Sequence, residues 1–134
     1  MKLLILHGPN MNLFGIRSAK EDNTITLDKI NRHIRKYIRN KNLDIKIIQT
    51  HNEVKAVSYL HTNRNKFDGL ILTPGVWQNS GHIIHDTLKI INLECITISI
   101  DENETINLFS KNKNIYNENI YKSFEESINY YVSK

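Results

Sequence analysis

The sequence predicts an α/β fold in which one parallel sheet lies between two layers of helices, and two features predict it. Four short apolar runs are each followed by polar turn material: LLIL (3–6), IKII (45–48), LIL (70–72) and CITISI (95–100). Continuous rather than alternating hydrophobicity indicates strands that are buried on both faces. Helical patterns lie between the runs, and this alternation favours parallel strands joined by right-handed crossovers.

Four stretches have the spacing of amphipathic helices. The first carries apolar residues on one face between Leu27 and Ile38, and Thr26 is its predicted N-cap. The others are expected at about 53–66, around 83–91 and from 124 to 132. The prediction is a flavodoxin-like three-layer sandwich with strand order 2-1-3-4, whose fifth strand is weak or missing.

Length and composition indicate one domain, residues 1–134, because 40% hydrophobic residues suffice for a single core. No apolar run approaches the roughly 18 residues of a membrane span, and the N-terminus turns polar too early for a signal peptide. The single Cys95 excludes an internal disulfide and a cysteine-cluster metal site. A cytoplasmic location is the simplest interpretation.

The net charge of +4 is concentrated in residues 28–41, which hold six Lys or Arg and one Asp. We interpret this stretch as the solvated face of a helix, because aromatic residues are not interleaved for base stacking. A nucleic-acid partner is therefore not expected.

Ligands in doubly wound folds bind beyond the carboxyl ends of the strands. This rule selects four loops, at residues 7–23, 49–53, 73–82 and 101–104. In the first, Arg17 could fix an anion or lower a neighbour's pKa, although a solvated surface arginine is an equal alternative. His7 is predicted to be a hydrogen-bonded structural group. His82 and His85 are three residues apart on a predicted helix, but no third ligand is evident, so no metal is expected.

The first loop, HGPNMNLFGIR, resembles the corresponding loop of the type II 3-dehydroquinate dehydratases (type II dehydroquinases). The resemblance continues through QTHNE, TPGVWQNSGHIIHD and CITISIDEN, to about Phe109. Beyond that residue the family's glycine-rich last strand is absent or reduced to something like NIY (119–121). The resemblance implies elimination of water from 3-dehydroquinate in the shikimate or quinate pathway. It also implies no cofactor, and trimers that pack into dodecamers.

In the family, an arginine-activated tyrosinate removes a proton beside the ketone, and a histidine protonates the departing hydroxyl. Asn10 and Arg17 stand at retained family positions. Asp22 stands at the tyrosine position, and Ser99 at the histidine position. Thr97 replaces the glutamate that would orient the histidine.

The substrate-binding positions are altered as well. Thr73 and Asn79 stand where the family has an asparagine and a histidine, whereas Asp86 retains the aspartate that contacts the ring hydroxyls. The family's two distal arginines correspond to Ile106 and Ser110 in this chain. Gln49 and Glu53 fit family positions that serve as scaffold or subunit contacts. The family binds its substrate's carboxylate at the backbone turn after Ile100, where this chain has Asp101 and Glu102. These two carboxylates should repel such a ligand, and Asp22 could pair with Arg17.

The residues at the family's base and acid positions and at most of its substrate-binding positions are all replaced. The sequence therefore predicts a dehydroquinase-like domain whose parent activity is lost or strongly impaired. One alternative is a lyase of altered chemistry with Asp22 as base and His7 or His82 as acid. Another is a basic nucleic-acid-binding module that uses the helix of residues 29–41. A small polyhydroxy acid is the expected ligand, a homo-oligomer the expected assembly, and no membrane partner is expected.

Overall fold

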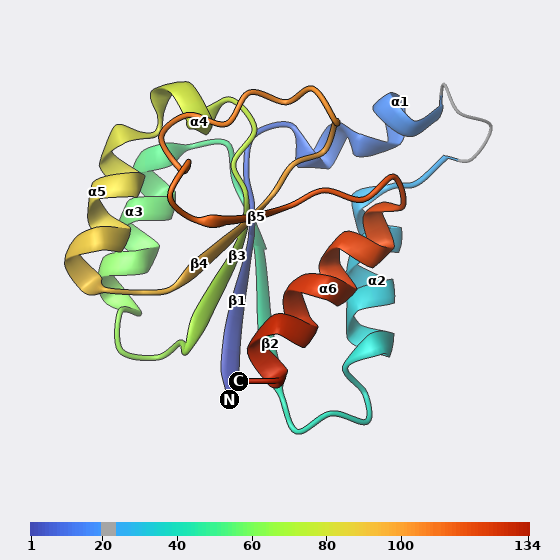
Figure 1. Ribbon diagram of the computed structural model, residues 1–134, viewed down its shortest axis with the longest axis horizontal. Coiled ribbons are helices and arrows are strands. Elements are labelled where there is room, and N and C mark those ends of the chain that lie inside the picture. The colour runs from blue at the N-terminus through green and yellow to red at the C-terminus, as the bar shows by residue number, and fades with distance from the viewer. Residues whose placement is uncertain (20–23) are drawn as a thin grey trace.

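A computed structural model describes residues 1–19 and 24–134. Within them, five parallel strands form one sheet in the order β2-β1-β3-β4-β5 (Figure 1). The strands are β1 (Lys2–His7), β2 (Asp44–Gln49), β3 (Gly69–Thr73), β4 (Cys95–Ile98) and β5 (Lys113–Ile115). The helices are η1 (Met11–Leu13), α1 (Phe14–Ser18), α2 (Leu27–Tyr37), α3 (Glu53–Thr62), α4 (Trp77–Ser80), α5 (His82–Ile91) and α6 (Ile120–Val132).

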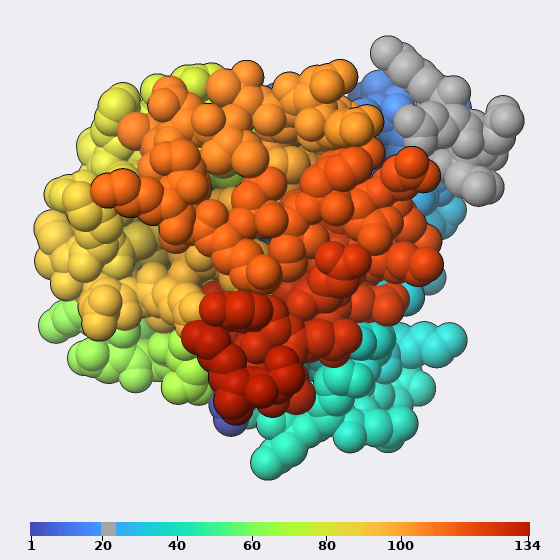
Figure 2. All heavy atoms as spheres, in the orientation of Figure 1, coloured from blue at the N-terminus to red at the C-terminus, as the bar shows by residue number. Residues whose placement is uncertain are grey.

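The layers are those of a three-layer sandwich, as predicted. Helices α2 and α6 cover one face of the sheet, and α3 and α5 cover the other (Figure 1). The short helices α1 and α4 lie at the carboxyl ends of the strands, opposite the two chain termini. The connection between β4 and β5, drawn in orange, covers the upper part of the face seen in Figure 2.

The fifth strand is present but only three residues long, and it pairs in parallel with β4 through Ile98 and Ile115. The prediction that its remnant lies at residues 119–121 is wrong. Asn119 instead caps α6, because its side chain accepts a hydrogen bond from the Tyr121 amide at 3.0 Å. The tripeptide NIY occurs twice, at 114–116 and at 119–121. Ile120, Phe124 and Ile128 are buried at helical spacing, so the second NIY lies in α6.

Most other predicted elements agree with the structure. Thr26 caps α2 by accepting a hydrogen bond from the Lys29 amide at 3.2 Å. Helix α3 ends at Thr62 rather than near residue 66, because Asn63 satisfies the Tyr59 carbonyl with its side-chain amide at 2.9 Å. The run IKII is not buried on both faces, since β2 forms an edge of the sheet.

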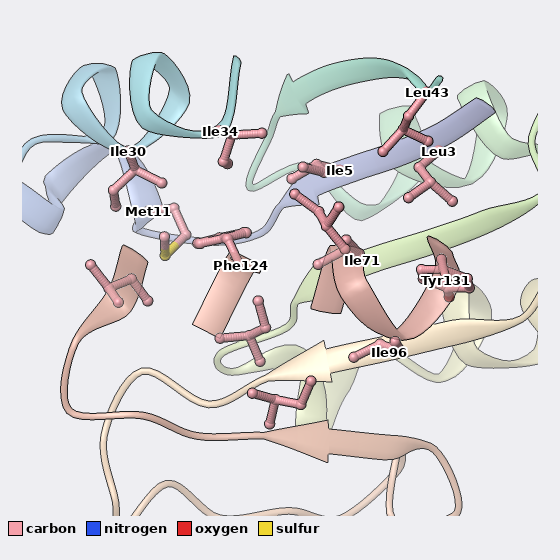
Figure 3. Packing of buried hydrophobic residues seen from close by; sticks show 14 of the residues in the cluster. Leu3, Ile5, Met11, Ile30, Ile34, Leu43, Ile71, Ile96, Phe124 and Tyr131 are labelled. Atoms are coloured by element: carbon pink, nitrogen blue, oxygen red, sulfur yellow. The ribbon is translucent and has the colours of Figure 1, made fainter. Parts of the chain in front are cut away.

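Alternating residues of the central strands supply two cores, one on each side of the sheet. Leu3 and Ile5 of β1 face α2 and α6 and belong to one buried cluster with Phe124 (Figure 3). Leu4 and Leu6 face α3 and α5. All five side chains have no exposed surface, and each such burial contributes roughly 1.5–3 kcal/mol to folding. Among the described residues, no helix has the length and apolar character needed to cross a membrane.

His7 ends β1 on the side of α2 and α6 and is completely buried. Its Nε2 lies 2.8 Å from Oδ1 of Asn31, and its ring meets Phe124 edge-on with centroids 5.5 Å apart. Burial lowers the pKa of His7 from 6.5 to about 4, although the bond to Asn31 opposes this effect. His7 is therefore a neutral structural group, in agreement with the sequence prediction.

The buried imidazole makes stability depend on pH. The unfolded chain binds a proton at His7 more readily than the folded chain does. The contribution of neutral His7 to the stability of the fold is therefore complete above about pH 6.5 and is lost as the pH falls towards 4. Between about pH 7 and pH 4.5, we expect the free energy of unfolding to fall by roughly 2–3 kcal/mol more in the wild type than in His7→Gln. Urea unfolding measures this difference. The exposed His61→Gln is the matched control and should behave like the wild type. An equal loss in His7→Gln would contradict this assignment.

Candidate functional site

A cavity of about 300 Å³ opens at the carboxyl ends of the strands. It is formed by three of the four predicted loops, those after β1, β3 and β4. Six of the predicted site residues line it: Asn10, Arg17, Thr73, Asn79, Ile100 and Asp101. Asp22 lies outside the described residues.

The loop after β1 is fixed by a close approach to β3. The Gly8 amide donates to both the carbonyl and the hydroxyl oxygen of Thr73, each at 3.1 Å. A Cβ atom on residue 8 would lie 2.3 Å from that carbonyl oxygen, so only glycine fits. The Thr73 hydroxyl, buried at the cavity floor, thus already accepts a hydrogen bond from the protein.

Asn10 then turns the chain into η1 and α1. Its φ of 69° is left-handed, a conformation that asparagine tolerates better than most residues. The Asn10 carbonyl accepts the Leu13 amide at 2.9 Å, which closes the first turn. Met11 and Phe14 are buried as a result, and Arg17 is carried to the rim of the cavity.

Three amide or carboxylate side chains act as scaffold around the cavity. Gln49 donates to the Gly8 carbonyl at 3.4 Å, and Glu53 accepts the Ile84 amide at 3.2 Å, as expected of scaffold positions. Gln78 is not marked by any signal in the sequence. Its buried Oε1 accepts the amides of Asn107 and Phe109 at 2.9 and 3.2 Å, and so fastens the β4–β5 connection to α4.

Arg17 forms an ion pair with Asp101, with Nη1 and Oδ2 separated by 3.3 Å. Both side chains are about half exposed or more, so the pair contributes no more than about 1 kcal/mol. The expected pairing of Arg17 with Asp22 falls outside the described residues. Because of the observed pair, the guanidinium at the cavity rim is already partly neutralised.

The turn after β4 places Asp101 at the cavity as predicted, but its second carboxylate there is Glu104 rather than Glu102. Glu102 is expected near the anion site, but it is exposed and does not line the cavity. The Glu104 amide donates to the Asp101 carbonyl at 3.1 Å, and this tight turn directs residue 102 outward and residue 104 inward. Sequence reasoning missed Glu104 because nothing but its spacing in the turn marks it.

Glu104 is half-buried, and its Oε2 is buried without a hydrogen-bond partner among the described residues. Burial raises the pKa of Glu104, and the charge of Asp101 acts in the same direction. The Ile100 amide and the Ser99 hydroxyl lie near the carboxyl group and, with Arg17, favour its charged form. Glu104 is thus an ionisable group at the cavity with unused hydrogen-bonding capacity.

Ser99 and Thr97 are buried beneath the cavity and do not line it. Both hydroxyls bond to Asn114 of β5: Thr97 donates to Oδ1 at 2.8 Å, and Ser99 accepts from Nδ2 at 3.0 Å. The position expected to hold an acid therefore holds a structural hydroxyl that ties β4 to β5. Sequence reasoning missed Asn114 because it places the fifth strand too late in the chain.

Several candidates are not brought to the cavity. Asp86, expected to contact ring hydroxyls, is exposed on α5 and does not line it. His82 is likewise exposed on α5, and His85 packs edge-on against Phe109 with centroids 5.2 Å apart. The described part of the chain holds no group of three or more potential metal ligands.

Comparison with known proteins identifies one family. A family model for Dehydroquinase class II matches residues 1–130. The 3-dehydroquinate dehydratase of Thermotoga neapolitana is 30% identical over 100 residues, which cover 75% of this chain and 68% of that protein. The 3-dehydroquinate dehydratase of Fusobacterium nucleatum is 28% identical over 103 residues, covering 75% and 70%.

Solved structures show the same fold. A type II dehydroquinase from Butyrivibrio crossotus superposes with a TM-score of 0.86 at 24% identity, covering 97% of this chain and 96% of that one. One from Propionibacterium acnes has a TM-score of 0.84 at 22% identity, covering 99% and 97%. The likeness extends past Phe109, so the short β5 and α6 belong to the shared fold.

The Arg17–Asp101 pair should weaken binding of an acidic ligand. Replacing Asp101 with Asn removes one negative charge and releases Arg17, so binding of 3-dehydroquinate should strengthen by about fivefold, the equivalent of about 1 kcal/mol. Isothermal titration calorimetry at neutral pH measures this. Glu102→Gln removes the same charge outside the cavity and should change affinity by less than about twofold. Equal effects of the two variants would show that the Arg17–Asp101 ion pair does not affect binding of 3-dehydroquinate.

Proposed function

Because the chain belongs to the class II dehydroquinase family, we propose that it is a dehydroquinase-like protein that has lost dehydration of 3-dehydroquinate or retains it strongly impaired. One observation carries the proposal: among the described residues, neither a histidine nor a tyrosine lines this cavity, whereas Tyr116 and Tyr121 line an adjoining cavity that shares Arg17 with it. The family's reaction needs a base beside the ketone and an acid at the departing hydroxyl.

The ionisable groups at the cavity do not supply both roles. The Arg17 guanidinium is permanently charged and cannot accept a proton. Asp101 is engaged by Arg17, which leaves Glu104 as the remaining described carboxyl group at the cavity. A single carboxyl group cannot act as base and acid on opposite sides of one substrate in the same step.

The altered-lyase alternative has less support. Asp22, its proposed base, is outside the described residues. Its candidate acids are His7, which is buried against Asn31, and His82, which is exposed on α5 and does not line the cavity. For the nucleic-acid alternative, the basic face of α2 provides positive charge, but its rings His33 and Tyr37 are already bonded to Glu125 and Asn129 of α6.

We also propose that the protein is a cytoplasmic homo-oligomer, a trimer or dodecamer as the family resemblance suggests. Three large apolar side chains on α3 and α5 support an assembly, because Val54, Ile83 and Ile90 are 69%, 58% and 75% exposed. The fully buried free thiol of Cys95 is compatible with a reducing compartment.

Purified protein should show no dehydration of 3-dehydroquinate above a buffer blank, measured by the ultraviolet absorbance of the enone product. The 3-dehydroquinate dehydratase of Thermotoga neapolitana serves as the positive control. A turnover of about 1 per second or more, within tenfold of the median for enzymes, would overturn the proposal.

Light scattering should give a mass of at least three chains. A second sample with Ile90→Asp, which places a charge on the most exposed of the three apolar side chains, should have a lower mass. Lys89→Asp is the control, because it places a negative charge at an exposed neighbouring position without removing an apolar side chain. It therefore tests whether the change in charge alone lowers the mass. A wild-type protein that scatters as a monomer would contradict the oligomer.

A further inference from the structure

The charges around the cavity are unbalanced once the ion pair is counted. The charged side chains that line it, among the described residues, are Arg17, Asp101 and Glu104. Arg17 and Asp101 neutralise one another at the rim. Among the described lining residues, Glu104 therefore leaves a net negative charge whenever its carboxyl group is ionised.

One oxygen of the Glu104 carboxyl group has no donor. Buried polar atoms nearly always have a hydrogen-bond partner, and an unpartnered carboxylate oxygen is costly to bury. The Ile100 amide and the Ser99 hydroxyl favour the charged form of the carboxyl group, yet Oε2 stays without a partner among the residues that the structure describes. Because Glu104 lines the cavity, a bound molecule that carries a donor can pair with this carboxyl group there.

The rest of the lining suits a compact polar ring. Asn10, Asn79 and Thr105 offer amide and hydroxyl groups that can both donate and accept hydrogen bonds. Met11 and Phe14 add apolar surface from below the first loop. A volume of about 300 Å³ is enough for one six-membered ring with short substituents.

We propose that the cavity binds a small polyhydroxylated ring compound that carries an ammonium group, with the ammonium directed at the Glu104 carboxylate. An ammonium group brings three donors and a charge opposite to that of Glu104. A carboxylate in the same place would face Glu104 and would have to compete with Asp101 for Arg17. This inference deepens the proposed function, on which it rests, by replacing the expected polyhydroxy acid with an amine of similar shape.

Three probes of similar size distinguish an amine, a neutral polyol and an acid as ligands. They are an amino-deoxy derivative of inositol, myo-inositol and quinate. Calorimetry at neutral pH should rank the amine first and quinate last, with the amine binding at least about tenfold more tightly than quinate. Glu104→Gln keeps the shape of the side chain but removes its charge. It should weaken amine binding at least about fivefold and leave inositol binding within about twofold.

Glu102→Gln is the matched control, because it removes the same charge at an exposed position that does not line the cavity. Circular dichroism and thermal melting establish that Glu104→Gln remains folded. The inference is overturned if quinate or inositol binds as tightly as the amine, if Glu104→Gln leaves amine affinity unchanged, or if no probe binds at millimolar concentration. Dehydration of 3-dehydroquinate is measured separately, so absent amine binding would leave the proposed loss of activity standing.

Discussion

Gly8 and Thr73 meet where two neighbouring central strands end, and the geometry of the ligand-binding edge depends on this contact. The Gly8 amide bonds to two oxygens of Thr73, and the approach is too close for any side chain on residue 8. It joins the loop after β1 to the loop after β3. The left-handed turn at Asn10 and the rim position of Arg17 depend on it. The shape of this edge therefore depends on a backbone contact rather than on ionisable side chains.

The structure separates residues that build the edge from residues that would react there. Gln49 and Gln78 use their side chains to bond backbone groups of the loops, and Glu53 bonds the Ile84 amide in the first turn of α5. Such bonds stabilise the cavity whether or not a ligand is converted. Ser99, expected at a catalytic position, is buried in a structural role, whereas Glu104, which sequence reasoning missed, lines the cavity.

The fold is largely predictable because apolar runs and helix caps are local signals. Thr26 and the buried strands can be identified from neighbouring residues alone. The fifth strand is misplaced because NIY occurs twice, and only packing distinguishes Asn114, bonded across to Thr97, from Asn119, which caps a helix. Glu104 is missed for a related reason: the direction of a side chain in a turn depends on backbone hydrogen bonds that composition does not reveal.

The hydrogen bonds of Thr97 and Ser99 to Asn114 limit which side chains position 99 can accept. The three side chains satisfy one another in a buried space between two strands. An imidazole at position 99 would have to displace the Asn114 amide and leave Thr97 without its acceptor. It could be introduced only with coordinated changes on both strands, because the single substitution would destabilise the fold.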